Sequence, residues 1–337
     1  MSGTVTPMAR DGVRGVTLQG IQAPVRDRLD RVIPDMHHVV SHDLPMIEQV
    51  SGHLLSKRGK LFRPTLALLA SDAEGRAEPQ AVRLASAIEL MHLATLVHDD
   101  SVDHSALRRG LPTVNALFSH QISVIMGDFL YSRALRALVE LESLPVLKIL
   151  TDVSNELAVG EMRQLAAIDS IEFDEAEYIK LIRAKTASLL SAACETGAFY
   201  GAIQHRAALA RYGDRLGLAF QIADDLLDYT EDEGTMGKPT GADLKEHKVT
   251  LPLIGALPRL SRAARARVDD LFADPTPSDA LVAEVVGIVG DAGGLDHARA
   301  SGARYAAEAN DALEALPDTP VRAALGDAIV YVMERRS

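Results

Sequence analysis

Two short acidic strings are the part of this sequence best equipped for chemistry. Both follow the pattern Asp-Asp-x-x-Asp, and the second begins 125 residues after the first: Asp99, Asp100 and Asp103, then Asp224, Asp225 and Asp228. In an α-helix, residues four apart share a face, so each string would gather three carboxylates on about one turn. Two unit charges ~5 Å apart repel by roughly 3 kcal/mol at an effective dielectric of ~20. We therefore expect cations here, and Mg²⁺ suits the site because it takes a few carboxylates together with water and substrate phosphates.

Two other interpretations of the acidic strings fit less well. A solvated helix face would not be flanked by apolar residues such as Leu96, Val97, Ile222 and Leu226. The di-iron carboxylate site of helical bundles needs a pair of Glu-x-x-His motifs. That motif occurs only once in the chain, at 89–92, so the magnesium interpretation is the stronger one.

Basic residues gather in the neighbourhood of the acidic strings and suggest bound phosphate groups. An arginine fork can hold two phosphate oxygens, whereas a lysine acts as a point charge. A local ion pair, such as Arg108 with Asp103, is the alternative for any single residue, but it does not account for the whole set. His92 joins the set because it lies two helical turns before Asp99 on the same face. The candidates are Lys60, Arg63, His92, Arg108, Arg109, Lys185, Lys238 and Lys248.

Helices are expected to position these residues. The chain is rich in Ala and Leu, lacks Trp and contains 4% aromatic residues, which is typical of a large helical protein. Apolar residues recur at the spacing of amphipathic helices, without the alternation that marks strands. The sequence predicts an all-α fold with helices over 41–57, 62–73, 79–104, 113–141, 144–169, 174–201, 204–231, 248–260, 279–291, 294–314 and 319–334.

Both acidic strings lie near the C-terminal ends of long expected helices, 79–104 and 204–231. This placement predicts one large helical bundle in which the two strings face a shared, deep central cavity at the same end. Metal and ligand sites of helical bundles are built in this way, from side chains on facing helices.

Composition limits the partners and the location. The net charge of −12 argues against nucleic-acid binding, and no run of 18 apolar residues could span a membrane. Residues 1–20 lack the apolar segment of a signal peptide, and we expect a flexible tail there, followed by one domain over 21–337. The single cysteine, Cys194, excludes an intramolecular disulfide and suits the reducing cytoplasm. Its apolar surroundings favour a buried thiol over a nucleophile.

Six strings in the chain resemble the trans-isoprenyl diphosphate synthases, also called polyprenyl synthetases, and the long-chain polyprenyl diphosphate synthases most closely. They are GKLFRP (59–64), ELMHLATLVHDDSVDHSALRRG (89–110), GDFLYSRA (127–134), AKT (184–186), AFQIADDLLDY (219–229) and MGKPTGADLKEHKVTLP (236–252). The resemblance runs from about residue 40 to the C-terminus. It implies an all-α homodimer that condenses an allylic diphosphate with isopentenyl diphosphate and so lengthens a trans prenyl chain.

The resemblance also implies roles for the acidic strings. Asp99 and Asp103, supported by Asp100, would bind Mg²⁺ on one wall of the cavity. Asp224 would bind it on the other wall, with Asp225 and Asp228 acting less directly. About three ions would hold the diphosphate of the allylic substrate between the walls.

The polar and basic residues divide between the two substrates. By resemblance, four would neutralise the allylic diphosphate: Arg108, Lys185, Lys238 and Lys248. Another four match the positions that hold isopentenyl diphosphate: Lys60, Arg63, His92 and Arg109. Thr186 and Gln221 would present oxygen dipoles to the cationic carbon. The chain departs from the family pattern at His247, where Gly commonly precedes the last lysine.

The expected reaction begins with departure of diphosphate, whose negative charge Mg²⁺ and the basic residues would stabilise. The double bond of isopentenyl diphosphate then attacks the allylic cation, so that positioning supplies much of the catalysis. A proton is lost to the departed diphosphate. No protein nucleophile is needed, but water must be kept out because it would quench the cation.

Product length is expected to depend on the residue five positions before the first acidic string. In the family a bulky aromatic residue there stops chain growth, and this chain has Ala94. Because one helical turn is about 5.4 Å, of the order of one isoprene unit, the next stops lie near Met91 or across the cavity near Leu135. We therefore expect a long product, with a short-chain farnesyl or geranylgeranyl diphosphate synthase as the alternative. A class I terpene cyclase or a non-catalytic synthase subunit would each normally lack one of the two complete Asp motifs.

Overall fold

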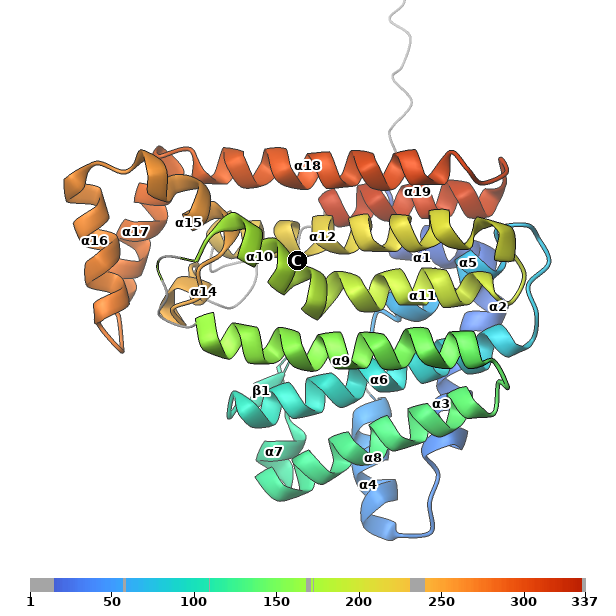
Figure 1. Ribbon diagram of the computed structural model, residues 1–337. Coiled ribbons are helices and arrows are strands. Elements are labelled where there is room, and N and C mark those ends of the chain that lie inside the picture. The colour runs from blue at the N-terminus through green and yellow to red at the C-terminus, as the bar shows by residue number, and fades with distance from the viewer. Residues whose placement is uncertain are drawn as a thin grey trace, which may run out of the picture.

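The computed structural model describes residues 15–334 except 57–58, 109, 168–170, 172 and 231–239. The described chain is all-α, as predicted (Figure 1), with helices at α1 Leu18–Gln22, α2 Arg26–Leu29, α3 Val32–Val40, α4 Pro45–Ser56, α5 Phe62–Ser71, α6 Gln80–Val102, α7 Val114–Leu117, α8 His120–Val139, α9 Leu144–Ala167, α10 Glu175–Ile182, α11 Ser188–Ala198, α12 Arg206–Thr230, α14 Ala242–Lys245, α15 Leu251–Ala256, α16 Arg262–Ala273, α17 Asp279–Asp291, α18 Gly294–Leu313 and α19 Pro320–Met333.

Short elements join these helices. Single 3₁₀ turns form η1 (Ala23–Val25), η3 (Ile203–His205) and η4 (Leu257–Arg259), and a π-helical turn, η2 (Arg183–Ala187), separates α10 from α11. Within the described ranges the only strands are β1 (Leu107–Arg108) and β2 (Leu111–Pro112), which pair in an antiparallel hairpin after α6.

The long helices pack side by side as one bundle. Helix α12 lies between α18 and α11, α11 also contacts α5, and α6 packs along α8 (Figure 1). Glycines on α12 permit the close approach to α11. A Cβ on Gly213 would come within 2.6 Å of the Leu190 carbonyl oxygen, and one on Gly217 within 2.4 Å of Ala187 Cα. The Gly217 contact brings the π-helical turn η2 against the middle of α12, about two helical turns before the second acidic string.

Both acidic strings occupy the predicted places. The first closes α6, with Asp103 as the C-cap residue. The second lies in the last two turns of α12, which ends at Thr230. The prediction that long helices carry the strings at their C-terminal ends is therefore confirmed.

Several helix boundaries differ from the predicted ones. The segment expected as one helix over 113–141 is α7 and α8, because Ser119 leaves the helical conformation and its hydroxyl accepts the Ile122 N–H as an N-cap. The segment 174–201 is interrupted by η2. Helices α3 and α16 were not predicted; α3 contains Pro34, and α16 is rich in charge and has only two buried side chains.

The first described helix begins slightly before residue 21. Helix α1 begins at Leu18, inside the segment expected as a flexible tail, and Ile21 is buried in the core. The domain limits at 21 and 337 stay a prediction. None of the helices within the described residues is both long and apolar enough to cross a membrane.

Candidate active site

The first acidic string presents its three carboxylates differently. Asp100 is buried, and its Oδ1 accepts a hydrogen bond from Nε of Arg108 at 2.7 Å. Arg108 reaches back because the β1–β2 hairpin turns at Gly110, whose φ of +73° suits glycine. Asp99 is partly buried, and Asp103 is exposed. The middle carboxylate is therefore neutralised within the protein, which leaves Asp99 and Asp103 for a ligand.

The second string shows a similar division. Asp225 is buried and accepts hydrogen bonds from the Tyr178 hydroxyl at 2.6 Å and from Nε2 of Gln221 at 2.8 Å. Asp228 accepts the backbone N–H groups of Ala242 at 3.1 Å and Asp243 at 3.0 Å, so it caps the first turn of α14. Asp224 is the exposed carboxylate of the three. In this arrangement Asp225 and Asp228 link α12 to neighbouring elements through hydrogen bonds, and Asp224 is the carboxylate most accessible to a ligand.

The π-helical turn η2 carries Lys185 and Thr186. Inserted turns of this kind often occur at functional sites. Lys185 Nζ lies 2.6 Å from Oε2 of Glu161 and donates to Oε1 of Gln164 at 2.6 Å. Gly160 allows this contact, since a Cβ there would lie 2.9 Å from that of Ala184. Helix α9, which packs against η2, therefore holds the lysine in place.

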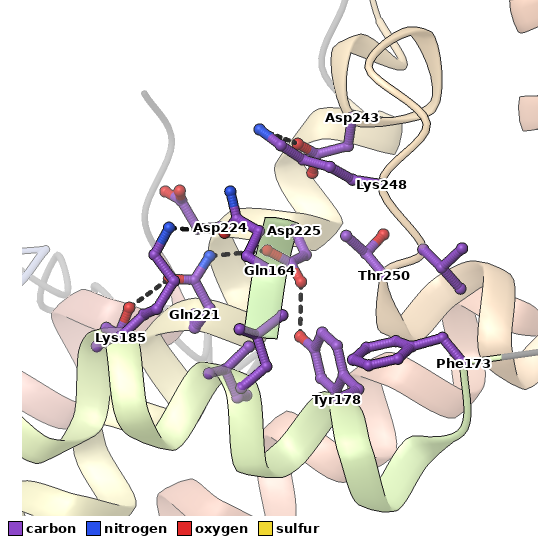
Figure 2. A pocket seen from close by; sticks show the side chains of 14 residues that line it. Gln164, Phe173, Tyr178, Lys185, Gln221, Asp224, Asp225, Asp243, Lys248 and Thr250 are labelled. Atoms are coloured by element: carbon purple, nitrogen blue, oxygen red, sulfur yellow. Dashed lines mark hydrogen bonds and ion pairs between the residues drawn. The ribbon is translucent and has the colours of Figure 1, made fainter. Parts of the chain in front are cut away.

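One cavity of about 290 Å³ collects the residues of the second wall. Figure 2 shows Lys185, Gln221, Asp224 and Asp225 converging on one side, with Lys248 and Asp243 above them. Lys248 Nζ is 2.5 Å from Glu246 Oε2 and 3.9 Å from Asp243 Oδ1. The structure thus brings together the residues predicted for the allylic diphosphate that come from η2, α12 and the segment after α14.

A second cavity, of about 680 Å³, collects the residues predicted for isopentenyl diphosphate. Its polar part contains Lys60, Arg63 and His92. Its apolar part includes the rings of Phe62 and Phe220, whose centres lie 6.1 Å apart. The ring of Tyr331 also lines this cavity, and Lys60 Nζ lies 5.9 Å from its centre. Arg108, predicted to serve the allylic diphosphate, lines this cavity too, so it lies at the boundary between the two sites.

Two predicted residues fall outside the described part of the chain. They are Arg109, assigned to isopentenyl diphosphate, and Lys238, assigned to the allylic diphosphate. Their roles stay predictions.

Some carboxyl groups of the site have raised pKa values, which means that the positive charge around them does not offset burial and the nearby negative charges. Burial, and then the nearby Glu161, raise the pKa of Asp99 to about 6, although Lys185 and Arg108 act in the opposite direction. Burial and then Asp228 raise the pKa of Asp243 to about 7. Burial lowers the pKa of Lys248 on the second wall, but the hydrogen bond to Glu246 and the charges of Asp243, Glu246 and Asp103 raise it above its ordinary value. Asp103 of the first wall is therefore close enough to act on a residue of the second. The two walls therefore share one electrostatic field.

This charge pattern fits divalent cations. Across the described residues, no three acidic, histidine or cysteine side chains converge closely enough to hold a metal ion by themselves. Mg²⁺ usually keeps several waters and takes only one or two carboxylates plus substrate phosphates. Asp103 and Asp224 are exposed carboxylates, and Asp99 is a partly buried one whose pKa is raised, so these three are the candidates to supply the carboxylates.

The residues predicted to set product length lie elsewhere. Ala94 and Met91 are buried, and helical spacing puts them on the face of α6 that carries His98. That face meets α8, where His98 Nε2 lies 3.2 Å from the Val124 carbonyl oxygen. Neither residue lines the two cavities described above, whereas Leu93 and Leu96 of α6 do. Leu135 is partly buried against the core. Their role in chain length stays a prediction.

Several polar residues of the site were not predicted, among them Glu161, Gln164, Tyr178 and Asp243. A signal existed for three of these four. Glu161 and Gln164 are three residues apart on a helix, which puts them on one face. Asp243 lies inside the string 236–252 that carried part of the resemblance, but only Lys238 and Lys248 had been assigned there.

Comparison with known proteins agrees with this geometry. The polyprenyl synthetase family model matches residues 44–289. An all-trans-nonaprenyl-diphosphate synthase (geranyl-diphosphate specific) from Rhodobacter capsulatus is 38% identical, over 94% of this chain and 98% of its own. A decaprenyl diphosphate synthase from Rhodobacter capsulatus superposes with a TM-score of 0.90 at 36% identity, over 94% of this chain and 99% of that one.

A second solved structure bears on the ligands. A polyprenyl synthase from Caulobacter crescentus, determined in complex with calcium and isoprenyl diphosphate, superposes with a TM-score of 0.89. The two sequences are 33% identical, and the superposition covers 97% of this chain and 100% of that one. From its fold, its sequence and its family match, this chain belongs to the polyprenyl synthetase family.

Proposed function

We propose that this protein is a chain-elongating prenyltransferase of isoprenoid biosynthesis, which condenses an allylic diphosphate with isopentenyl diphosphate to give a long trans-polyprenyl diphosphate. The observation that carries this proposal is the pair of neighbouring cavities. One contains the second acidic wall with Lys185 and Lys248, and the other contains Lys60, Arg63 and His92. Two separate polar sites, one rich in carboxylates and one rich in cations, suit two diphosphate substrates that react with each other.

The acidic walls are assigned to the allylic diphosphate. Mg²⁺, about three ions when bound, would link its oxygens to Asp99, Asp103 and Asp224 and neutralise charge on the leaving group. Lys185 is held by Glu161 and Gln164 at the mouth of the same space, where a fixed ammonium favours developing negative charge. The Thr186 hydroxyl donates its hydrogen to Gln221 Oε1 at 2.8 Å, which leaves the oxygen lone pairs of Thr186 available to face a carbocation.

The cation-rich cavity is assigned to isopentenyl diphosphate. Lys60, Arg63 and His92, together with Arg109, would hold its diphosphate. The rings of Phe62 and Phe220 form an apolar wall that suits a five-carbon alkene and keeps water from the reacting carbons. Holding the double bond beside the allylic carbon makes the condensation effectively intramolecular, which can lower the barrier by about 7–11 kcal/mol.

A long product is supported by relatives that are named as nonaprenyl and decaprenyl diphosphate synthases. A short-chain farnesyl or geranylgeranyl diphosphate synthase is the second candidate. A terpene cyclase or a non-catalytic subunit fits less well, because both acidic strings are complete.

We also propose a homodimer in the cytoplasm. Helices α8 and α9 expose apolar side chains, with Ile125 66% and Met162 68% exposed, beside Val124, Val159 and Leu165. A monomer rarely leaves so many apolar residues on adjacent helices uncovered, and twofold pairing is the commonest oligomeric symmetry. Light scattering at micromolar protein should give about twice the mass of one chain. A monomer with full activity would contradict the proposal.

The proposed reaction is tested with the purified protein alone. It is incubated with Mg²⁺, isopentenyl diphosphate and, in separate reactions, geranyl or farnesyl diphosphate, and the dephosphorylated products are separated by chain length. Linear prenols longer than geranylgeraniol are expected. Cyclic hydrocarbons would indicate a cyclase, products no longer than twenty carbons the short-chain alternative, and no turnover of either starter a non-catalytic subunit.

A further inference from the structure

Tyr178 on α10 is a buried side chain with a contact that the proposed reaction does not yet use. Its side chain is 1% exposed. Its hydroxyl donates a hydrogen bond to Oδ2 of Asp225 at 2.6 Å, and Figure 2 shows the ring standing below that carboxylate. A buried tyrosine hydroxyl normally finds a partner. Here the partner is a carboxylate of the second acidic string, which gives the tyrosine a place in the site.

The contact belongs to a continuous series of hydrogen bonds. Asp225 Oδ1 accepts from Nε2 of Gln221 at 2.8 Å, and Gln221 Oε1 accepts from the Thr186 hydroxyl at 2.8 Å. Each oxygen of the Asp225 carboxylate therefore receives one donor, Tyr178 on one side and Gln221 on the other. Because the amide of Gln221 can satisfy both neighbours in only one orientation, fixing Asp225 also fixes Gln221 and Thr186.

Tyr178 is itself held firmly by the fold. Asp174 caps α10 by accepting the Glu177 N–H at 2.9 Å. At the same end of the helix, Glu175 Oε2 lies 2.8 Å from Nε2 of His297 on α18. The tyrosine therefore transmits the position of α10, which the Glu175–His297 contact ties to α18, to the carboxylate on α12.

We propose that Tyr178 is a positioning residue for the second acidic wall. It holds Asp225, and through Asp225 the Gln221 amide, in the orientation in which the wall binds a metal–diphosphate group. The proposal rests on the proposed function, because it assumes that this wall binds diphosphate with Mg²⁺. Residues that orient a metal-binding group from behind typically change metal affinity or activity by ten- to a hundredfold when they are removed.

The test uses Tyr178→Phe, which removes the hydroxyl and keeps the ring. Tyr212→Phe is the matched control: Tyr212 is also fully buried, lies on α12 and donates to the Leu325 carbonyl oxygen at 2.8 Å, away from both cavities. The probe is MgCl₂ with inorganic diphosphate, and the readout is the rise in thermal midpoint as the probe is titrated. In Tyr178→Phe the half-saturating probe concentration should increase ten- to a hundredfold. In Tyr212→Phe it should match wild type, even where its own midpoint is lower. Equal half-saturation in all three proteins would overturn the proposal.

Asp225→Asn removes the acceptor charge of the same contact and provides an independent arm. If Tyr178 acts through Asp225, the double variant should bind the probe no more weakly than Asp225→Asn alone. If the effects of the two substitutions on half-saturation multiply in full, the proposal is overturned. Asp225→Asn with wild-type half-saturation would also overturn it, even if Tyr178→Phe did not fold.

The proposed reaction can fail independently of this role. A wild-type protein that binds the probe but elongates no allylic starter disproves the reaction and leaves this role of Tyr178 intact. A wild-type protein that does not respond to the probe disproves the role.

Discussion

Asp99→Asn should stabilise the metal-free protein while it abolishes activity. Burial and the charge of Glu161 raise the pKa of Asp99 from 3.8 to about 6, so the folded protein disfavours the ionised form. At 1.36 kcal/mol per pH unit, this difference costs the folded state about 3 kcal/mol at pH 8. The sign follows from linkage: the penalty is absent below the unfolded pKa, grows between 3.8 and about 6, and is complete above that range. Asparagine keeps the shape and removes the charge.

The assay is chemical unfolding in EDTA at several pH values. The variant should gain about 3 kcal/mol at pH 8 and about half as much at pH 5. With Mg²⁺ and both substrates, its turnover should fall by several orders of magnitude, because the first wall has lost one of the two carboxylates that the protein leaves for a ligand. Asp327→Asn, an exposed change in the middle of α19, is the control and should shift stability by less than about 0.5 kcal/mol at either pH. A gain that does not depend on pH, or near-normal turnover of Asp99→Asn, would refute the reasoning.

Three further changes probe other parts of the site. Arg63→Ala should raise the KM for isopentenyl diphosphate by roughly ten- to a hundredfold, because a charge-assisted hydrogen bond to the substrate is lost. The KM for the allylic diphosphate should rise much less. Equal changes in both would mean that the two cavities are misassigned. Ala94→Phe should shorten the product toward fifteen or twenty carbons. It should also lower the stability of the protein by about 1–3 kcal/mol, because Ala94 is buried on the face of α6 that meets α8. An unchanged product in a folded variant would disprove the chain-length role. Gly217→Ala should destabilise the protein and reduce turnover, since its Cβ would lie 2.4 Å from Ala187 Cα, whereas the control Gly287→Ala meets nothing within 4 Å and should be neutral or stabilising.

The sequence was most informative where local spacing decides the outcome. Carboxylates at positions 99, 100 and 103 share a helix end because of helical periodicity alone, and α6 and α12 carry the strings where that periodicity predicted. The residues of the cation-rich cavity were found because they lie in contiguous strings. Helix boundaries were less predictable where a capping residue interrupts an apolar pattern. Ser119 is an example, because its hydroxyl caps the start of α8 and so divides the helix that was expected over 113–141.

The division of labour within each string could not be predicted, because it depends on which neighbour tertiary packing supplies. All six aspartates look alike in the sequence. In the structure, Asp100 is paired with Arg108 and Asp225 is held by Tyr178 and Gln221. Asp228 caps α14, which begins fourteen residues further along the chain. No spacing rule indicates these partners, since each contact is set by a hairpin, a separate helix or a returning loop.

Glu161 shows why that tertiary information matters for function. A carboxylate beside Lys185 looks unfavourable in a site meant to bind diphosphate, because it competes for the ammonium group. It also adds negative charge next to Asp99, where it helps to raise the pKa. Both effects disfavour the empty site and favour one that contains cations together with diphosphate. A diphosphate arriving without metal meets a lysine that is already paired and a wall of carboxylates that repel it. If the site binds diphosphate as proposed, this arrangement would favour the metal complex of the substrate over the free anion, although the charge of Glu161 alone would suggest the opposite.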